Sequence, residues 1–312
     1  MSISTDINEM LLRDVFEVYT QAEQRMLERL AKRVKRGVTD TGWTEEKFND
    51  VQKLRREVEA TLGDVNQLAK AKLSDGIIKA YKAGVASASK DMGKAVSILD
   101  DFVPEHVQRM ILETNNLIDG TSFQILRNTQ DAYRSIISET STQALLGVET
   151  RLETAQNALN MFAAKGITGF VDRAGRRWDL ASYVEMATRT TTARAALQGH
   201  IDRQTEIGND LVMVSSIGTT CPICAQWQGK VLSISGNDKR YPSLESAKAA
   251  GLFHPNCKHT ITAYFPEIDD YEPPVTKNNP EKYEATQKQR YNERQIRKWK
   301  RVEAAAMTPE AR

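Results

Sequence analysis

Two short turns hold the residues of this sequence that could do chemistry. One is Cys221-Pro-Ile-Cys224 and the other is His254-Pro-Asn-Cys257, each a ligand-type residue, a proline, one further residue and a cysteine. Each turn offers two donor side chains to one ion, with proline fixing φ between them, which is a common way to hold zinc. The predicted ligands of a closed tetrahedral zinc site are Cys221, Cys224, His254 and Cys257, with His259 competing for the histidine place or lying just outside it.

A plainer interpretation of these residues is that reduced cysteines pack as small buried apolar groups, with the histidines filling core or surface positions. All three cysteines of the chain lie between residues 221 and 257. An odd number gathered in one segment predicts a reducing compartment and metal binding rather than a disulfide framework. A closed site also predicts a structural metal, because catalytic zinc keeps one position open for water.

The composition is that of a soluble protein of about two domains, with 312 residues of which 27% are charged. The N-terminal residues lack a basic region followed by an apolar core, and no apolar run approaches membrane-spanning length. We therefore expect neither a signal peptide nor a membrane anchor. The net charge of +2 is too small to indicate a nucleic-acid binder by itself, but the positive excess collects at the C-terminus.

The first half of the chain has the periodicity of long helices. Apolar residues recur every three or four positions from Ile7 to Arg36, where Gly37 is placed to end the helix, and again from Phe48 to Leu68. These stripes predict a helical hairpin that packs within this chain or on a partner.

Further helical patterns follow in the same half. Small residues between 75 and 100 permit close approach of helices, and a helix from Pro104 is expected to break at Asp119-Gly120. Another pattern continues from Ser122 and resumes after a polar segment. We predict a helical region over residues 1–165 with no catalytic cluster, in which His106 stands alone and is structural.

A small α+β domain is predicted over residues 166–268. Glycines and short β-type pieces before Leu180 indicate a hairpin or loop. The remaining expected elements are helices over 180–200 and 243–250 and strands over 211–215, 230–235 and 260–264. Strands flanking both cysteine-containing turns would place the turns side by side, as a shared metal requires. The fold class is therefore α+β, predominantly α.

The last part, residues 269–312, is predicted to be a proline-containing tether followed by a basic helix. As a helix, the segment from residue 288 to residue 301 presents a thin apolar side and a basic surface suited to DNA or to an acidic protein groove. A solvated terminal helix is the competing interpretation. The predicted contact residues are Lys288, Arg290, Arg294, Arg297, Lys298, Lys300 and Arg301.

Several segments together carry a resemblance to a known family. They are Gly166–Trp178, Arg189–Gly199, Asp210–Ser215, Trp227–Val231, GLFHPNCKH at 251–259 and the terminal QRYNERQIRKWKR. They resemble the minor capsid proteins of tailed bacteriophages, more narrowly the minor capsid protein 2 branch of the Mu-F-like head morphogenesis family. The resemblance covers about residues 166–301 with specific motifs, and the helical first half only in general character.

The resemblance implies a non-enzymatic virion protein, present in few copies inside the head near the portal, that assists head assembly and the handling or delivery of packaged DNA. Its implied partners are the portal or other capsid proteins and packaged double-stranded DNA, with no small-molecule substrate. It would be in the host cytoplasm during assembly. Family resemblance does not by itself imply that zinc is bound.

Two other functions are compatible with parts of the sequence. In a metal-dependent nuclease, His254, Asn256 and His259 would surround a divalent ion while arginines hold the phosphodiester, but no nearby carboxylate is placed as a ligand or base. A DNA-binding regulator could use the basic tail, but no helix-turn-helix is evident.

Overall fold

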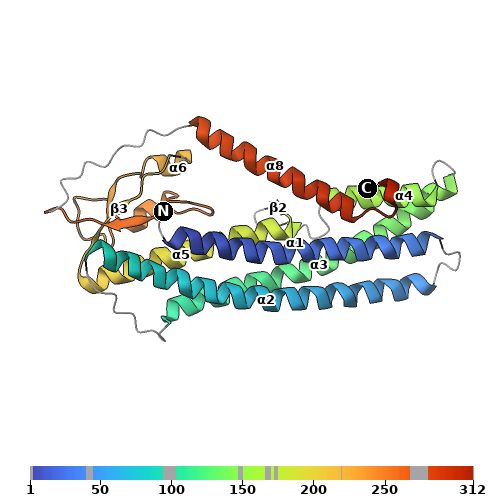
Figure 1. The fold of residues 1–312 in the computed structure, drawn as a ribbon, viewed down its shortest axis with the longest axis horizontal. Helices are drawn as coiled ribbons and strands as arrows, with labels where there is room; N and C mark the ends of the chain where they lie inside the picture. Colours follow the sequence, from blue (N-terminus) through green and yellow to red (C-terminus); the bar gives the residue numbers. More distant parts are fainter. Residues whose placement is uncertain are drawn as a thin grey trace. The chain divides into compact units, whose positions relative to one another are not determined.

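The computed structural model describes residues 3–39, 45–93, 103–146, 150–165, 170–171, 175–218, 220–267 and 280–311. In these parts long α-helices predominate, and short strands form one two-stranded and one three-stranded sheet (Figure 1). This is the predominantly α form of the α+β class that the sequence predicts. No helix in the described residues has a stretch long and apolar enough to cross a membrane.

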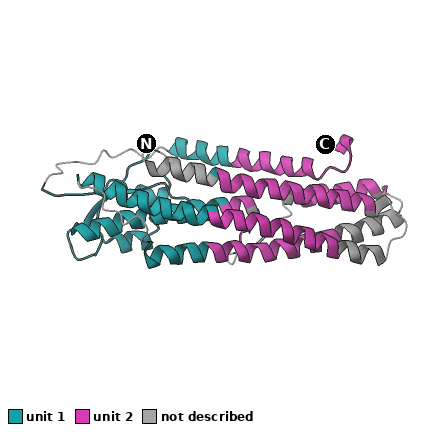
Figure 2. Ribbon diagram, turned by 60° about the horizontal axis from the view of Figure 1, so that its bottom comes forward, with its two compact units in different colours: residues 1–13, 72–114, 185–290 teal, residues 14–71, 115–184, 291–312 magenta. Residues whose placement is uncertain are grey.

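The chain divides into two compact units that do not follow the order of the sequence (Figure 2). Unit 1 comprises residues 1–13, 72–114 and 185–290, and unit 2 comprises residues 14–71, 115–184 and 291–312. Several long helices therefore contribute residues to both units. The boundaries at 165 and 268 stay a prediction, and most of the predicted tether (268–279) lies outside the described residues.

Unit 2 is built on the two helices that the apolar stripes predict. Helix α1 (Ile3–Thr39) continues two residues past the expected stop at Gly37, and α2 (Glu45–Asp91) joins the second stripe to the small-residue segment in one helix. Tyr19 of α1 is buried, and its hydroxyl donates to the Asn66 side chain of α2 at 2.9 Å. The stripes thus pack within this chain, the first of the two alternatives.

Helix α3 (Glu105–Leu146) corrects the predicted break at Asp119-Gly120, because it runs through both residues. A glycine inside a helix costs only about 1 kcal/mol relative to alanine. Local and tertiary contacts oppose this cost: the Asp119 carboxylate pairs with Lys70 of α2, and the hydroxyl of Thr121 donates to the Ile118 carbonyl at 2.7 Å. Contacts made by the folded helix therefore outweigh the tendency of the Asp119-Gly120 pair to form a turn.

The remaining elements of unit 2 include a capped helix and a hairpin. Helix α4 (Arg151–Lys165) begins with a capping box, in which Thr150 Oγ1 accepts from the backbone N–H of Glu153 at 3.2 Å and the Glu153 carboxylate accepts from that of Thr150 at 3.0 Å. Strands β1 (Phe170–Val171) and β2 (Arg177–Trp178) pair antiparallel, so of the two predicted forms, hairpin or loop, the structure has the hairpin.

Unit 1 contains the three-stranded antiparallel sheet, in the order β4-β3-β5. Its strands are β3 (Leu211–Val214), β4 (Val231–Ser233) and β5 (Ile261–Ala263), each within a predicted strand. They are accompanied by α5 (Leu180–Ile207), α6 (Pro222–Ala225) and α7 (Leu244–Ala249), and α8 (Pro280–Ala304) begins in this unit. The buried core contains Ile201, Val212, Val214, Cys224, Leu232, Leu244, Ala247, Leu252 and Ile261.

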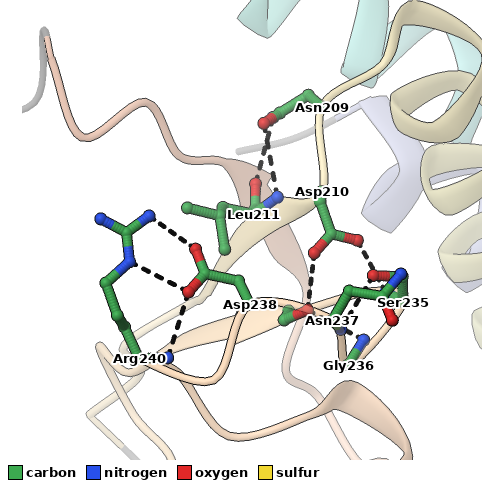
Figure 3. A network of polar contacts seen from close by, with 9 residues as sticks. Asn209, Asp210, Leu211, Ser235, Gly236, Asn237, Asp238 and Arg240 are labelled. Atoms are coloured by element: carbon green, nitrogen blue, oxygen red, sulfur yellow. Dashed lines mark hydrogen bonds and ion pairs between the residues drawn. The ribbon is translucent and has the colours of Figure 1, made fainter.

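A polar network fixes the turn that follows β4. The Asp210 carboxylate, just before β3, accepts from the Ser233 hydroxyl at 2.6 Å and from the backbone N–H of Ser235 at 2.7 Å (Figure 3). Further along the same turn, the Arg240 guanidinium donates to the Asp238 carboxylate at 2.7 Å. Gly236 supplies the positive φ of 72° at the predicted Gly236-Asn237 turn. Asp210 therefore ties the end of β4 to the start of β3.

Two glycines let α2 and α5 approach closely inside unit 1. A Cβ added to Gly84 would lie 2.0 Å from the backbone oxygen of Ala196, and one added to Gly199 would lie 2.2 Å from that of Tyr81. No side chain fits at either contact. The prediction that small residues permit close helix approach is confirmed at Gly84.

Candidate metal centre

The first cysteine turn is a single turn of helix positioned by β3. Cys221 is the N-cap of α6, its sulfur accepting from the backbone N–H of Cys224 at 3.4 Å, and Pro222 occupies the first helical position. Cys224 is fully buried in the core of unit 1. The local sequence thus turns both sulfurs to the same side of a short, capped helix.

The second turn lies between α7 and β5 and has an unusual backbone. The residues flanking the His254-Pro255 pair, Phe253 and Asn256, have positive φ values of 59° and 65°. Asparagine tolerates this conformation, but a bulky residue such as phenylalanine adopts it rarely. The backbone N–H of Cys257 donates to the His254 carbonyl at 2.9 Å and closes the turn.

The sheet brings the two turns together. Strand β3 leads into the first turn, and β5 leaves the second, and these strands pair antiparallel with Val214 opposite Ile261. The end of β3 therefore lies beside the start of β5. This is the side-by-side placement that the sequence predicts.

All five predicted metal ligands gather in this place. The ligand atoms of Cys221, Cys224 and His254 lie within 4.8 Å of one another, as do those of Cys224, Cys257 and His259. Cys224 belongs to both groups, so the five side chains form one continuous cluster. This cluster could hold a metal ion.

Some of the distances between ligand atoms in the cluster are close to those around a tetrahedral zinc ion, and one is too short. Zinc ligands lie about 3.8 Å apart for two sulfurs and about 3.6 Å apart for sulfur and nitrogen, given their usual bond lengths. The sulfurs of Cys224 and Cys257 are 3.8 Å apart, and Cys257 Sγ lies 3.4 Å from His259 Nδ1. Cys221 Sγ lies only 3.0 Å from His254 Nε2, which is a hydrogen-bond distance.

The hydrogen-bond partners of the other ring nitrogen, in contrast, favour His254 over His259 as the metal ligand. His254 Nδ1 lies 2.8 Å from the Pro255 carbonyl, so an N–H there leaves Nε2 free to bind an ion. A metal-bound histidine almost always has such an outer partner. His259 Nε2 is buried and has no hydrogen-bond partner among the described residues. The outer contacts therefore favour His254, although the sulfur–nitrogen distance at His259 is nearer to a metal-bound one.

Burial disfavours charge at the centre of the cluster. It raises the pKa of Cys224 far above its usual value, with the neighbouring Cys257 adding to the effect, and it lowers the pKa of His259 from 6.5 to about 4. At Cys221 burial also raises the pKa, but the hydrogen bond from the Cys224 N–H and the interaction with His254 outweigh it, and the net shift is downward. A divalent cation would supply the charge that stabilises several thiolates here.

A pocket of about 210 Å³ opens beside the cluster. One wall comes from the two cysteine turns and the residues that follow them, and the other comes from the first turns of α8. Its lining residues are Ile217, Cys221, His254, Pro255, Asn256, Cys257, Lys258, His259, Tyr283, Thr286, Gln287 and Arg290. Sequence reasoning placed Arg290 on a separate tail and missed this proximity, because no local signal relates α8 to the second turn.

The predicted basic contact residues have different surroundings. Lys288, Arg294 and Lys300 are exposed, and Arg297 lies over the Phe16 ring at 5.2 Å. Arg301 is buried in unit 2, where its Nε donates to the Ala163 carbonyl at 3.1 Å and its guanidinium lies 3.8 Å from the Glu23 carboxylate. This placement argues against the contact role predicted for Arg301, since burial removes it from any large partner.

His106 is not alone, contrary to the expectation from the sequence. Its Nε2 lies 3.0 Å from the Asp202 carboxylate, which also accepts from the Tyr81 hydroxyl at 2.9 Å. These three residues come from α3, α5 and α2 within unit 1 and link the helices there. Their separation along the chain leaves no sequence signal that could have found them.

Known proteins resemble this chain over most of its length. The family described as phage minor capsid protein 2 matches residues 6–311. A protein of Lactococcus phage LL-H, named "Structural protein", is 26% identical over 267 residues, which cover 76% of this chain and 70% of that protein. No solved structure matches the chain.

Proposed function

The chain belongs to the phage minor capsid protein 2 family, and on that premise we propose that it is a structural protein located inside the phage head near the portal. There it assists head morphogenesis and the handling or delivery of packaged DNA, and it passes through the host cytoplasm during assembly. The observation that carries the proposal is the extent of the match. It includes the helical first half, the cysteine and histidine cluster and α8, so one structural role accounts for all three.

In this proposal the cysteine and histidine cluster binds a structural zinc ion. Cys221, Cys224 and Cys257 supply thiolates and His254 supplies a fourth, neutral ligand, which leaves no position open for water. Zinc supplies a cross-link here: it would join two turns whose cysteines Cys224 and Cys257 are 33 residues apart and so offset the entropy of closing that loop.

Replacing one ligand tests the zinc site. The substitution Cys257→Ser should release zinc from the purified protein and lower its thermal stability, measured by elemental analysis and by circular dichroism during heating. Thr262→Ser, a conservative change at an exposed position of β5, is the control and should keep both. A wild-type protein without metal, together with unchanged stability in Cys257→Ser, would refute the zinc site.

Helix α8 is the proposed contact region for DNA or for an acidic surface of another capsid protein. Beside its exposed basic residues it carries three exposed apolar side chains, Tyr291, Ile296 and Trp299, which are 53%, 56% and 62% exposed. Large apolar side chains left in water beside positive charge are suited to a partner surface. The portal is the proposed protein partner, since the helical region offers long surfaces to a ring of subunits.

Protection inside the particle tests the location. Protease added to purified intact particles should leave this protein whole, whereas the same treatment after osmotic rupture should cleave it. Immunogold labelling of ruptured heads should mark the portal vertex. Cleavage in intact particles at the rate seen for the major surface protein would contradict an internal position.

A nuclease remains the competing function, and the geometry gives it less support. Both histidines that it needs lie beside cysteine sulfurs, and none of the residues that line the described pocket is acidic. Incubation of plasmid DNA with the protein and magnesium or manganese distinguishes the two. Nicking that disappears in His259→Ala would establish the nuclease and overturn a purely structural role.

A further inference from the structure

The pocket beside the metal cluster has an unusual charge. In a chain with 41 acidic residues, the lining contains none, but it contains Lys258 and Arg290. No ion pair to either of these two residues is found within the described parts of the chain. Two cationic groups therefore meet at one concave surface, and no carboxylate is among the described residues that line it.

Neutral hydrogen-bonding groups complete the wall. Asn256 is held in the left-handed conformation at φ 65°, and Tyr283 and Gln287 line the pocket from α8. His259, 8% exposed, also lines it, and its buried Nε2 has no hydrogen-bond partner among the described residues.

The net charge around the pocket favours an anion even when the charge of the zinc cluster is included. Zinc with three thiolates and a neutral histidine carries a net charge of about −1, because each bound thiolate is deprotonated. Lys258 and Arg290 add two positive charges, so the surroundings of the pocket stay positive by about one charge. Arginine, moreover, presents a fork of donors that matches phosphate oxygens.

We propose that this pocket binds a phosphate group, through Arg290 of α8 and Lys258 beside the second cysteine turn. The proposal deepens the DNA-handling role and rests on it, because it assigns one place where the backbone of packaged DNA contacts the protein. A phosphodiester of DNA and a free phosphate ion share this chemistry. The metal would then also affect phosphate binding, because a metal that fixes the second cysteine turn would fix one wall of the pocket.

The test uses the full-length protein and a matched pair of variants. Arg290→Gln removes one of the two pocket cations, and Arg109→Gln removes an exposed arginine of α3 that does not line the pocket, so both lower the net charge equally. Binding of inorganic phosphate is measured by calorimetry, and binding of a short labelled DNA duplex by fluorescence anisotropy. Lys258→Gln is the second pocket variant in case Arg290→Gln does not fold.

We expect the pocket variants to weaken phosphate binding by roughly ten-fold or more, which is the usual effect of losing a hydrogen bond to a charged group. Arg109→Gln should leave phosphate binding unchanged, and Arg290→Lys should fall between, because it keeps the charge and loses the fork of donors. Selective weakening of both ligands assigns the pocket to the DNA backbone, and selective weakening of phosphate alone assigns it to a free phosphate. Both outcomes support a phosphate site.

The proposal is overturned if the pocket variants weaken neither ligand more than Arg109→Gln does. Zinc content is measured on the same samples, so that two failures stay distinct. A metal-free protein that still binds phosphate selectively contradicts the zinc site and supports the pocket. A zinc-loaded protein without a selective effect of the pocket variants contradicts the pocket alone.

Discussion

His254 and His259 offer the same side chain to one cysteine cluster, but their environments differ. His254 has a backbone carbonyl for its second nitrogen, and its ring is half-buried at the mouth of the cluster. His259 is buried, close to Cys257, and its second nitrogen has no partner among the described residues. We infer that His254 is the metal ligand and that His259 contacts the ligand Cys257 without binding the metal itself.

Separate alanine substitutions test this assignment. Losing an outer partner of a metal ligand typically costs roughly 10–100-fold in metal affinity. We expect His259→Ala to stay within that range and His254→Ala to exceed it, because the latter removes a ligand. Competition with a chromophoric chelator measures both affinities, and the absorption of the cobalt-substituted protein reports the loss of a nitrogen ligand. The reverse order of affinities would show that His259 is the ligand.

The buried residue His200 in unit 1 leads to a prediction about how the free energy of unfolding depends on pH. Burial lowers its pKa from 6.5 to about 4, and its ring lies 3.8 Å from the Asp91 carboxylate. The unfolded chain therefore binds a proton below pH 6.5 that the folded protein refuses until about pH 4. The free energy of unfolding should fall across this window as the pH drops, by at most about 3 kcal/mol.

Comparison of wild type with His200→Gln isolates this contribution, because other titrating groups are common to both. Urea denaturation at a series of pH values should show a shallower acid loss of stability in the variant. Asp91 has its pKa raised by burial, so its own contribution is lost as the pH rises and acts in the opposite direction. Equal slopes in the two proteins would exclude His200 as the source.

At the scale of elements, helix packing decided where glycine is needed and where it is only tolerated. Gly84 in α2 meets the backbone of α5, whereas Gly63 in the same helix has no atom within 4 Å of an added Cβ. Both residues interrupt an otherwise regular helical sequence, and sequence alone gives them the same weight. The difference is a property of the contact between two helices.

This pair of glycines gives a matched prediction. Gly84→Ala should destabilise the protein by about 1–3 kcal/mol or more, because the new methyl group meets a backbone oxygen that cannot move aside. Gly63→Ala should stabilise it by about 0.5–1 kcal/mol through the higher helix propensity of alanine. Urea denaturation measures both. A tolerated Gly84→Ala would contradict the close approach of α2 to α5.

For the whole molecule, the metal cluster and the three-stranded sheet belong to unit 1, whereas the described parts of unit 2 are helical apart from the β1–β2 hairpin. Among the described residues, the groups that could hold a metal ion lie between Cys221 and His259. A metal there would stabilise the short strands, because β3 leads into one of the turns that it would join and β5 leaves the other. Unit 2 holds its helices through their own buried stripes.

Metal removal should therefore act unevenly along the chain. Hydrogen exchange followed by mass spectrometry should show that a chelator speeds exchange in β3, β4 and β5, while α1 in unit 2 keeps its protection. The chelator should change nothing further in Cys257→Ser, which serves as the control. Uniform acceleration along the chain, or none in the strands, would contradict a metal that stabilises the sheet.

The sequence by itself determined the features that local interactions control. Apolar spacing predicted α1 and the start of α2, and the cysteine turns with their flanking strands were placed correctly because proline, capping and alternation act over a few residues. Only the tertiary structure decided that α3 continues through Gly120, that Arg301 is buried and that Arg290 faces the second turn. Those outcomes depend on contacts between residues far apart in the chain, which no local pattern encodes.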